Sequence, residues 1–237
     1  DIGATLSLAR IMSVGRNVLP KVLHTALGSV ATPSVRNLAT LGGQLCSPEG
    51  GGDALPALAA VGAQVELRSL GSARWLPAGR FVDSPTPLRA GEVVCRVRVP
   101  LEEGDFQVYR KVGHRPGSTH GGLSFAGVAR LPKGTLEGLH CSFGGLGFGP
   151  LPGRELEARL KNARLPLTPK AVEGLLQELR RQLQPREPAA AARGAAPESG
   201  TAASPAAAPG SEAGRMDEEY RAATALRLLR WFLDGLS

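Results

Sequence analysis

Alternation of apolar and polar residues marks several short segments of the chain as strands. A side-chain period of two is typical of strands that bury one face. The segment 92–100 is the clearest of them, because it alternates after Val94 and is ended by Pro100. The predicted strands are residues 1–8 (leaving into a turn), 64–68, 73–77, 92–100, 123–131 and 136–143.

Other segments place apolar residues at every third or fourth position, which predicts amphipathic helices. These helices are residues 18–30, 54–60, 154–160, 169–183 and a last one from Met216 onward. In 169–183 the apolar stripe is Ala171, Leu175, Leu176 and Leu179; in the last helix we expect core contacts from Tyr220, Ala223, Leu226, Leu229, Trp231 and Leu233. A loop is predicted over 81–88, which contains Pro85 and Pro87.

Composition marks one linker in the chain, and the segment 106–115 opens a second unit. Residues 184–214 are Ala, Pro, Gly and Ser with few large apolar side chains, which predicts a flexible insertion. We therefore expect a first unit over 1–103, a second over 104–184 plus 215–237, and a disordered linker over 185–214. A chain of 237 residues can bury two modest cores, and an aromatic content of 4% means that Leu, Val and Ala must fill them.

Charge and cysteine content exclude several classes of function. The net charge is +7, but the arginines are scattered without a basic block interleaved with aromatics, so we expect surface or subunit-interface roles and no nucleic acid. The three cysteines are far apart, which predicts reduced thiols in a cytoplasmic protein and no zinc or iron–sulfur ligand set. No apolar run reaches the roughly 18 residues of a membrane span.

The chain also lacks the residue groupings of common catalytic sites. It shows no Ser-His-Asp or Cys-His arrangement and no paired carboxylates, and its histidines, such as His24, His114 and His120, have no metal ligands at suitable spacing. We therefore expect no catalytic side chain and no metal site. The Gly-rich run 144–149 matches no phosphate-loop motif and is interpreted as structural.

The strongest binding candidate is the stretch 31–53. Gly42-Gly43 would let a ligand approach the backbone, and free N–H groups there would form a nest for a phosphate. The helix predicted at 54–60 would add a favourable N-terminus next to Asp53. An ordinary Gly-Gly turn is the alternative. The surrounding polar side chains are Thr40, Gln44, Ser47 and Asp53.

This stretch resembles the second flavin-binding segment of the FAD-binding subunit or domain of the xanthine dehydrogenase family, the molybdenum hydroxylases. Residues 35–37 and 39–43 fall in register with the family's "IRN-x-(A/G)-(T/S)-(I/V)-GGN", and Asp53 with its "SP-x-(S/A)-D". Gln44 replaces the usual Asn, and 49–52 also depart from the pattern. Further pieces match in order: "IGA" at 2–4, "GE" and "IP" around 91–100, "Y-x-K" at 109–111 and "YR" at 220–221.

The resemblance implies an α+β fold: a PCMH-type (type 2) FAD-binding subdomain, then a C-terminal domain of antiparallel strands and helices like that of the carbon monoxide dehydrogenase flavoprotein. It implies FAD as the cofactor. It also implies an oxidoreductase component, active only with an iron–sulfur subunit and a molybdenum-cofactor subunit, that relays electrons to NAD, a quinone or oxygen. The cofactor-binding positions carried over are Ala39, Thr40, Gly42, Gly43, Gln44, Cys46, Ser47, Asp53, Val93, Val94 and Lys111.

Individual roles are implied by the same resemblance. Thr40 to Gln44 would contact the phosphates and ribityl chain, and Val93 and Val94 the ring or adenine region. Lys111 would lie near the ring and offset its negative charge on reduction; an ordinary strand lysine is the alternative. The family's first flavin segment lies upstream of "IGA", so residues from Asp1 onward are expected to hold half of the site, and 115–122 depart from the family. A structural or assembly protein that has lost flavin is therefore a second hypothesis.

Overall fold

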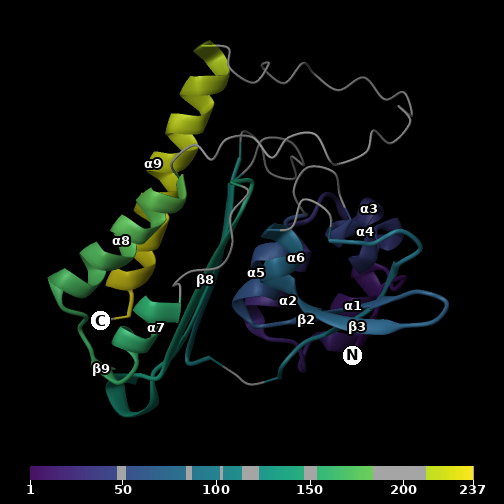
Figure 1. Ribbon diagram of the computed structural model, residues 1–237, viewed down its shortest axis with the longest axis horizontal. Helices are drawn as coiled ribbons and strands as arrows, with labels where there is room; N and C mark the ends of the chain where they lie inside the picture. The colour runs from purple at the N-terminus through teal and green to yellow at the C-terminus, as the bar shows by residue number, and fades with distance from the viewer. Residues whose placement is uncertain are drawn as a thin grey trace.

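The computed structural model describes residues 1–46, 52–83, 87–101, 104–113, 123–146, 154–183 and 212–236. In these parts of the chain, two antiparallel sheets are flanked by helices, and the second sheet stands between the helices of the first part and those at the C-terminal end (Figure 1). The observed class is therefore α+β, as expected.

The first sheet has the strand order β1-β4-β2-β3, with every neighbouring pair antiparallel. Alternation gives it two different faces: Val65 and Leu67 are buried beneath helices, whereas Trp75 and the ion-paired Glu66 lie on the opposite face. The predicted strands 64–68, 73–77 and 92–100 are thus present. Their bounds are β1 Ile2–Gly3, β2 Gln64–Arg68, β3 Ala73–Pro77 and β4 Val93–Arg98.

Six helices accompany the first sheet among the described residues: α1 Leu8–Gly15, α2 Lys21–Ser29, α3 Pro33–Leu38, α4 Leu41–Leu45, α5 Leu55–Ala60 and α6 Ala78–Asp83. The predicted loop over 81–88 is wrong at its start. Residues 81–83 belong to α6, which packs on α5 and buries Ala78 and Phe81 in the first core. Burial of that phenylalanine outweighs the turn signal of the two prolines that follow.

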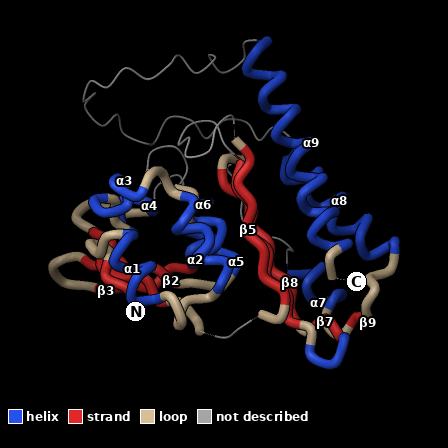
Figure 2. Tube along the Cα trace, turned by 180° about the vertical axis from the view of Figure 1, so that it is seen from behind, coloured by secondary structure: helices blue, strands red, loops and turns tan. Residues whose placement is uncertain are grey.

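The second sheet has the order β5-β6-β8 and separates the two cores. Its strands are β5 Phe106–Val112, β6 Leu123–Arg130 and β8 Gly138–Gly144. Tyr109 and Ala126, opposite each other in register, face α2 and α5 and join the first core. The alternate residues Phe125 and Phe143, paired in register, join the second core with residues of the C-terminal helices. These helices lie on the other side of β5 and β8 from α2 and α5 (Figure 2).

The C-terminal helices are α7 Arg154–Leu160, α8 Pro169–Leu183 and α9 Glu212–Asp234. A separate two-stranded antiparallel sheet, β7 Thr135–Leu136 with β9 Ala163–Arg164, packs on the second core through Leu136 and Ala163. The predicted strand 136–143 is therefore split at Glu137 between β7 and β8. The stripe predicted for α8 is correct for Leu175, Leu176 and Leu179, all of which are buried.

Helix α9 differs from its prediction in start and orientation. It begins at Glu212, four residues before Met216, and so includes the last three residues of the expected linker; the rest of that linker, 185–211, lies outside the described residues. Tyr220, Ala223 and Trp231 are exposed. The predicted core contacts of Leu229 and Leu233 are confirmed, since both are buried, and Leu226 is partly buried against the second core. The buried residues that the prediction missed are Ala225, Phe232 and Leu236.

Phe232 explains this orientation of α9. A Cβ atom on Gly127 would lie 2.7 Å from the Phe232 ring, so the glycine lets the ring rest directly on the backbone of β6. The same ring packs beside Phe106 and Phe125, with centroid distances of 5.5 Å to each. These contacts rotate the helix so that the residue before Phe232, Trp231, points outward, where Arg110 lies over its indole ring.

Candidate functional site

Helix α4 contains the paired glycines, and its N–H groups are already bonded within the protein. Thr40 is the N-cap, and its Oγ1 accepts a hydrogen bond from the Gly43 N–H at 3.1 Å. The Gly42 N–H donates to the carbonyl of Ala4 at 2.8 Å, and the Gln44 N–H donates to the carbonyl of Thr40 at 3.1 Å. The prediction of free N–H groups that form a phosphate nest is therefore wrong, because α4 docks its first turn on the chain after β1.

The two glycines of α4 have different surroundings. A Cβ atom on Gly42 would meet the Ala4 carbonyl oxygen and Cβ at 3.0 Å, so this glycine is needed for close packing inside the protein. Gly43 is exposed, and a Cβ there would meet only its own capping oxygen, Thr40 Oγ1, at 3.2 Å. Only the outer side of Gly43 is open to an approaching ligand.

Gln44 carries an unsatisfied buried acceptor. Its Oε1 is inaccessible to solvent and has no hydrogen-bond partner among the residues that the structure describes. The backbone of Gly52 lies directly against it, since the Gly52 N–H donates to the Gln44 carbonyl at 2.8 Å and a Cβ on Gly52 would clash with Oε1. A buried acceptor without a donor costs free energy, which a ligand hydroxyl or N–H group would recover.

Asp53 follows this contact and pairs with Lys111 from the second sheet. Lys111 Nζ donates to Asp53 Oδ2 at 2.6 Å, and the two side chains are only 14% and 20% exposed. The pair thus joins the polar stretch after α4 to strand β5. A chain of contacts through Gly52 and Asp53 thus links Lys111 to Gln44.

Tyr109 lies two residues before Lys111 on the same face of β5 and is a contact that the sequence prediction missed. Its hydroxyl donates to the Asp53 backbone carbonyl at 3.1 Å and accepts from Ser29 Oγ of α2 at 3.1 Å. Burial raises the pKa of the Tyr109 phenol well above its ordinary value, so the hydroxyl keeps its proton. The period of two along β5 could have grouped Tyr109 with Lys111, whereas nothing in the sequence indicates Ser29.

The remaining predicted positions are spread around this group. Ala39 and Val94 are partly buried and pack against the first core, whereas Val93 is 59% exposed on β4. β4 is connected to α4 through Ala4, whose N–H donates to Cys95 and whose carbonyl accepts from α4. Cys46 is exposed just after α4, and Ser47 lies outside the described residues.

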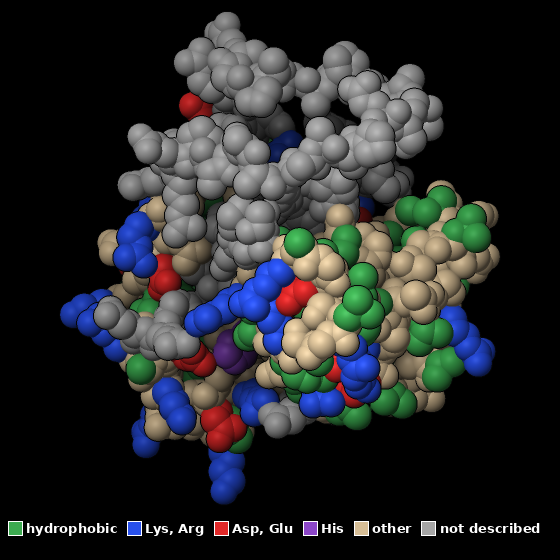
Figure 3. Space-filling view, turned by 45° about the vertical axis from the view of Figure 1, so that its right-hand side comes forward, with side chains coloured by type: hydrophobic (Ala, Val, Ile, Leu, Met, Phe, Trp, Pro, Cys, Tyr) green, Lys and Arg blue, Asp and Glu red, His purple; other side chains and the backbone are tan. Residues whose placement is uncertain are grey.

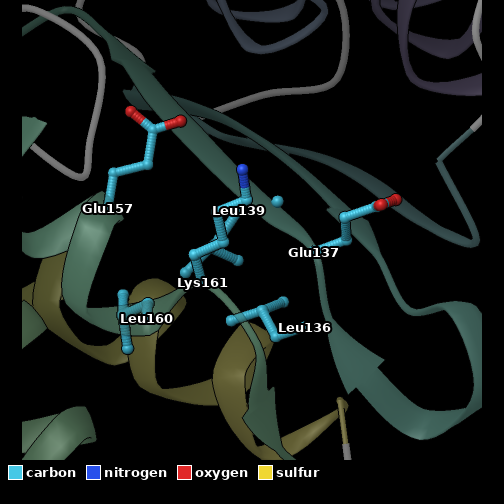
Figure 4. A pocket seen from close by; sticks show the side chains of 7 residues that line it. Leu136, Glu137, Leu139, Glu157, Leu160 and Lys161 are labelled. Atoms are coloured by element: carbon cyan, nitrogen blue, oxygen red, sulfur yellow. The ribbon is translucent and has the colours of Figure 1, made fainter.

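Two hollows elsewhere are not part of this group. A cavity of about 240 Å³ lies where residues 60–62 meet Gln107, Val128 and His140. Gln107 is four residues before Lys111, roughly 13 Å along β5. The second hollow, between β8 and α7 beside Lys161 and Glu157 (Figure 4), has a volume of about 10 Å³, which is room for about one water molecule.

The surface charges of the first sheet are largely paired. Glu92 accepts two bonds from Arg74, both at 2.8 Å, and the guanidinium lowers the Glu92 pKa to about 2. Glu66 is held by Arg96 and Arg68. The hydrogen bonds from Arg96 and Arg68 lower the pKa of Glu66 as well. On the face in Figure 3, blue cationic side chains accordingly lie among acidic and apolar ones.

Metal and membrane features are not found in the described parts of the chain. No group of three or more His, Cys, Asp or Glu residues there is placed to hold a metal ion. No helix of these parts is both long and apolar enough to cross a bilayer.

An α+β architecture with a polar group shared by the stretch after α4 and strand β5 suits a protein that binds an organic cofactor. Residues 1–102 match the family described as the FAD binding domain in molybdopterin dehydrogenase. The chain is similar to FAD-binding medium subunits of the molybdopterin and xanthine dehydrogenase family, and this similarity includes the FAD-binding domain matched by residues 1–102. The resemblance seen in the sequence is thereby confirmed.

Two curated relatives illustrate this relationship. The chain is 28% identical over 169 residues to the glyceraldehyde dehydrogenase medium chain of Sulfolobus acidocaldarius, covering 70% of this chain and 59% of the relative. It is 24% identical over 191 residues to the xanthine dehydrogenase FAD-binding subunit of Escherichia coli O157:H7, covering 78% and 64%. The chain thus spans less than two thirds of the length of either relative.

Solved structures share the fold. Carbon monoxide dehydrogenase from Hydrogenophaga pseudoflava matches 98% of this chain and 72% of its own, with a TM-score of 0.68 and 22% identity. Quinoline 2-oxidoreductase from Pseudomonas putida 86 matches 98% of this chain and 74% of its own, with a TM-score of 0.63 and 18% identity. The described elements therefore share the fold of these two chains.

Proposed function

We propose that this chain is the FAD-carrying electron-transfer subunit of a molybdenum hydroxylase. The observation that carries the proposal is the buried, unsatisfied Gln44 Oε1, which lies against Gly52, the residue before the ion-paired Asp53, within a chain whose residues 1–102 match an FAD-binding domain. In this proposal residues 1–103 are part of a PCMH-type subdomain. Residues 104–184 and 215–237 form a C-terminal domain like that of the carbon monoxide dehydrogenase flavoprotein.

The polar residues present suit FAD, which carries hydroxyl and N–H donors as well as phosphates. Gln44 Oε1 would accept from such a donor, which would satisfy the buried oxygen. The phosphates would contact the outer side of α4 at Thr40 and Gly43, since the inner N–H groups are already bonded. Lys111 would place its positive charge near the ring.

FAD supplies the redox chemistry of such a subunit, because it accepts electrons singly and delivers them in pairs. The side chains of this chain bind and orient the cofactor and tune its charge. We further propose an iron–sulfur subunit and a molybdenum-cofactor subunit as partners, and NAD, a quinone or oxygen as the acceptor. The two relatives described above are themselves a medium chain and an FAD-binding subunit of dehydrogenases.

A second candidate is an assembly protein that keeps the fold without the flavin. One observation favours it: the Gly42, Gly43 and Gln44 N–H groups are all occupied within the protein, so the backbone of α4 offers no phosphate nest. If the chain does bind FAD, its contacts at α4 would come from side chains. The two candidates differ in whether the purified chain holds flavin.

The test is flavin uptake by the full chain and by Gly43→Asp. The wild-type protein should show the visible absorption bands of bound flavin, as purified or after adding FAD. Asp at position 43, next to the phosphates, should weaken FAD binding at least roughly tenfold through charge repulsion. Its fold should be retained, because Gly43 is exposed and an acidic residue suits the first turn of a helix.

Gly71→Asp is the matched control. Gly71 lies in the exposed turn between β2 and β3, and a Cβ there would have no atom within 4 Å. This variant should bind FAD like the wild type. A colourless wild-type chain that takes up no added FAD would reject the proposal in favour of the assembly protein. Equal FAD binding by Gly43→Asp and wild type would show that the cofactor does not bind next to α4.

A further inference from the structure

Tyr109 joins three segments that are far apart in the sequence. The side chain is buried, at 6% exposure, on the face of the second sheet that meets the first core. Its hydroxyl donates to the Asp53 carbonyl and accepts from Ser29 Oγ, both at 3.1 Å. The partners are 56 and 80 residues away along the chain.

Strand β5 therefore holds Asp53 at two points. Tyr109 binds its backbone carbonyl, and Lys111 binds its carboxylate at 2.6 Å. Because residues two apart in a strand lie on the same face, the spacing between the two β5 side chains is set by the backbone. Because Asp53 is hydrogen-bonded at both its backbone and its side chain, its carboxylate cannot turn away from Lys111.

The third partner fixes the tyrosine itself. Ser29 is at the end of α2, and its Oγ lies within hydrogen-bond distance of both the Ala26 carbonyl, at 2.7 Å, and the phenol, at 3.1 Å. The one Ser29 hydroxyl proton is shared between these two acceptors, and the contact places the phenol against a helix of the first core. Burial, the largest effect, raises the phenol pKa, while its bonds to Ser29 and Ser124 act in the opposite direction. A neutral phenol keeps its single proton available for the Asp53 carbonyl at all physiological pH values.

We propose that Tyr109 is a positioning residue for the flavin site: it holds the backbone of Asp53 so that the Asp53 carboxylate fixes the Lys111 ammonium group. Tyr109 acts through Asp53 and Lys111 and does not itself touch the cofactor. This inference rests on the proposed function, since the quantity it affects is the affinity of the chain for FAD. The proposal predicts that the effect of Tyr109 on FAD affinity requires Lys111.

The experiment is a double-mutant cycle on the full chain, with FAD affinity measured well below the melting temperature. Tyr109→Phe keeps the packing of the ring and removes one hydroxyl, so FAD binding should weaken about fivefold, the equivalent of one hydrogen bond. In a Lys111→Met background the same change should weaken binding by less than about twofold, because the group that it positions is gone. Tyr220→Phe, in the only other tyrosine of the chain and at a side chain 60% exposed, is the control and should bind FAD normally.

A purely structural role gives a different pattern. It would lower the melting temperature of Tyr109→Phe by about 3 °C while FAD affinity stayed at the wild-type value, and that outcome overturns the proposal. Equal fivefold losses with and without Lys111 also overturn it, since Tyr109 would then act independently of the lysine. Failure of the proposed function is recognised separately, because the wild-type chain itself would bind no FAD.

Discussion

Replacing Asp53 by Asn removes the negative charge from the Asp53–Lys111 pair and keeps the shape of the side chain. At the observed 2.6 Å, the gross attraction between the two charges is about 6 kcal/mol at the effective dielectric constant of a partly buried site. Much of this attraction is cancelled by the free-energy cost of removing the two charged groups from water. Removal of one partner costs roughly 3–5 kcal/mol in fully buried pairs and less than about 1 kcal/mol in exposed ones.

With exposures of 14% and 20%, the pair lies between these limits, and we expect a loss of about 2 kcal/mol. The free energy of unfolding should be measured by urea titration of the flavin-free chain, followed by circular dichroism. The melting temperature should fall by about 6 °C for a protein of this size. The m-value should not change, because the same surface is exposed on unfolding.

Glu173→Gln provides a matched control. Glu173 pairs with Arg180 of the same helix at 2.7 Å, nearly the same distance, but its side chain is 49% exposed and that of Arg180 is 52% exposed. This variant should lose less than about 0.5 kcal/mol. A loss of the same small size in Asp53→Asn would show that the Asp53–Lys111 pair is solvated and does not tie the stretch after α4 to β5.

Two other contacts can be tested in the same way. Phe232→Ala should lower the free energy of unfolding by about 3–5 kcal/mol, because the fully buried ring packs on Gly127. Its exposed neighbour Trp231→Ala should cost only about 1 kcal/mol, and equal losses in thermal melts would contradict the orientation of α9. For Glu92 the folded-state pKa of about 2 is lowered from an ordinary value of 4.5, so its stabilising effect is present above pH 4.5 and is lost as the pH falls toward 2. Urea titrations at stepped pH should therefore show a weaker pH dependence in this range for Glu92→Gln than for wild type; identical slopes would mean that Arg74 does not hold the carboxylate in the folded state.

Local patterns were sufficient for most strands and helices, because the period of two or of 3.6 depends only on neighbouring residues. The strand around Val65 and the stripe around Leu175 were therefore predicted correctly. The helical start of 81–88 was missed, because Phe81 is helical through its burial against α5, which no local pattern contains. The face of α9 was missed for the same reason, since Gly127, about a hundred residues away, determines it.

The candidate site could be predicted as a set of positions but not as an arrangement. The resemblance named Asp53 and Lys111 separately, and only the fold shows that they form a pair across 58 residues of sequence. The Gly-Gly signature predicted a close approach of a ligand to the backbone, and at Gly42 the structure shows a close contact of a different kind. It could not show that the contact is with Ala4 inside the protein and not with a phosphate.

The second sheet has a consequence for how the molecule folds. Successive residues of β6 belong to different hydrophobic cores: Phe125 packs with the C-terminal helices and Ala126 with α2 and α5. A single strand therefore contributes to both cores, and neither core can be completed unless that strand is in place. We therefore expect the two cores to unfold together, so that a substitution that weakens either core reduces the stability of both.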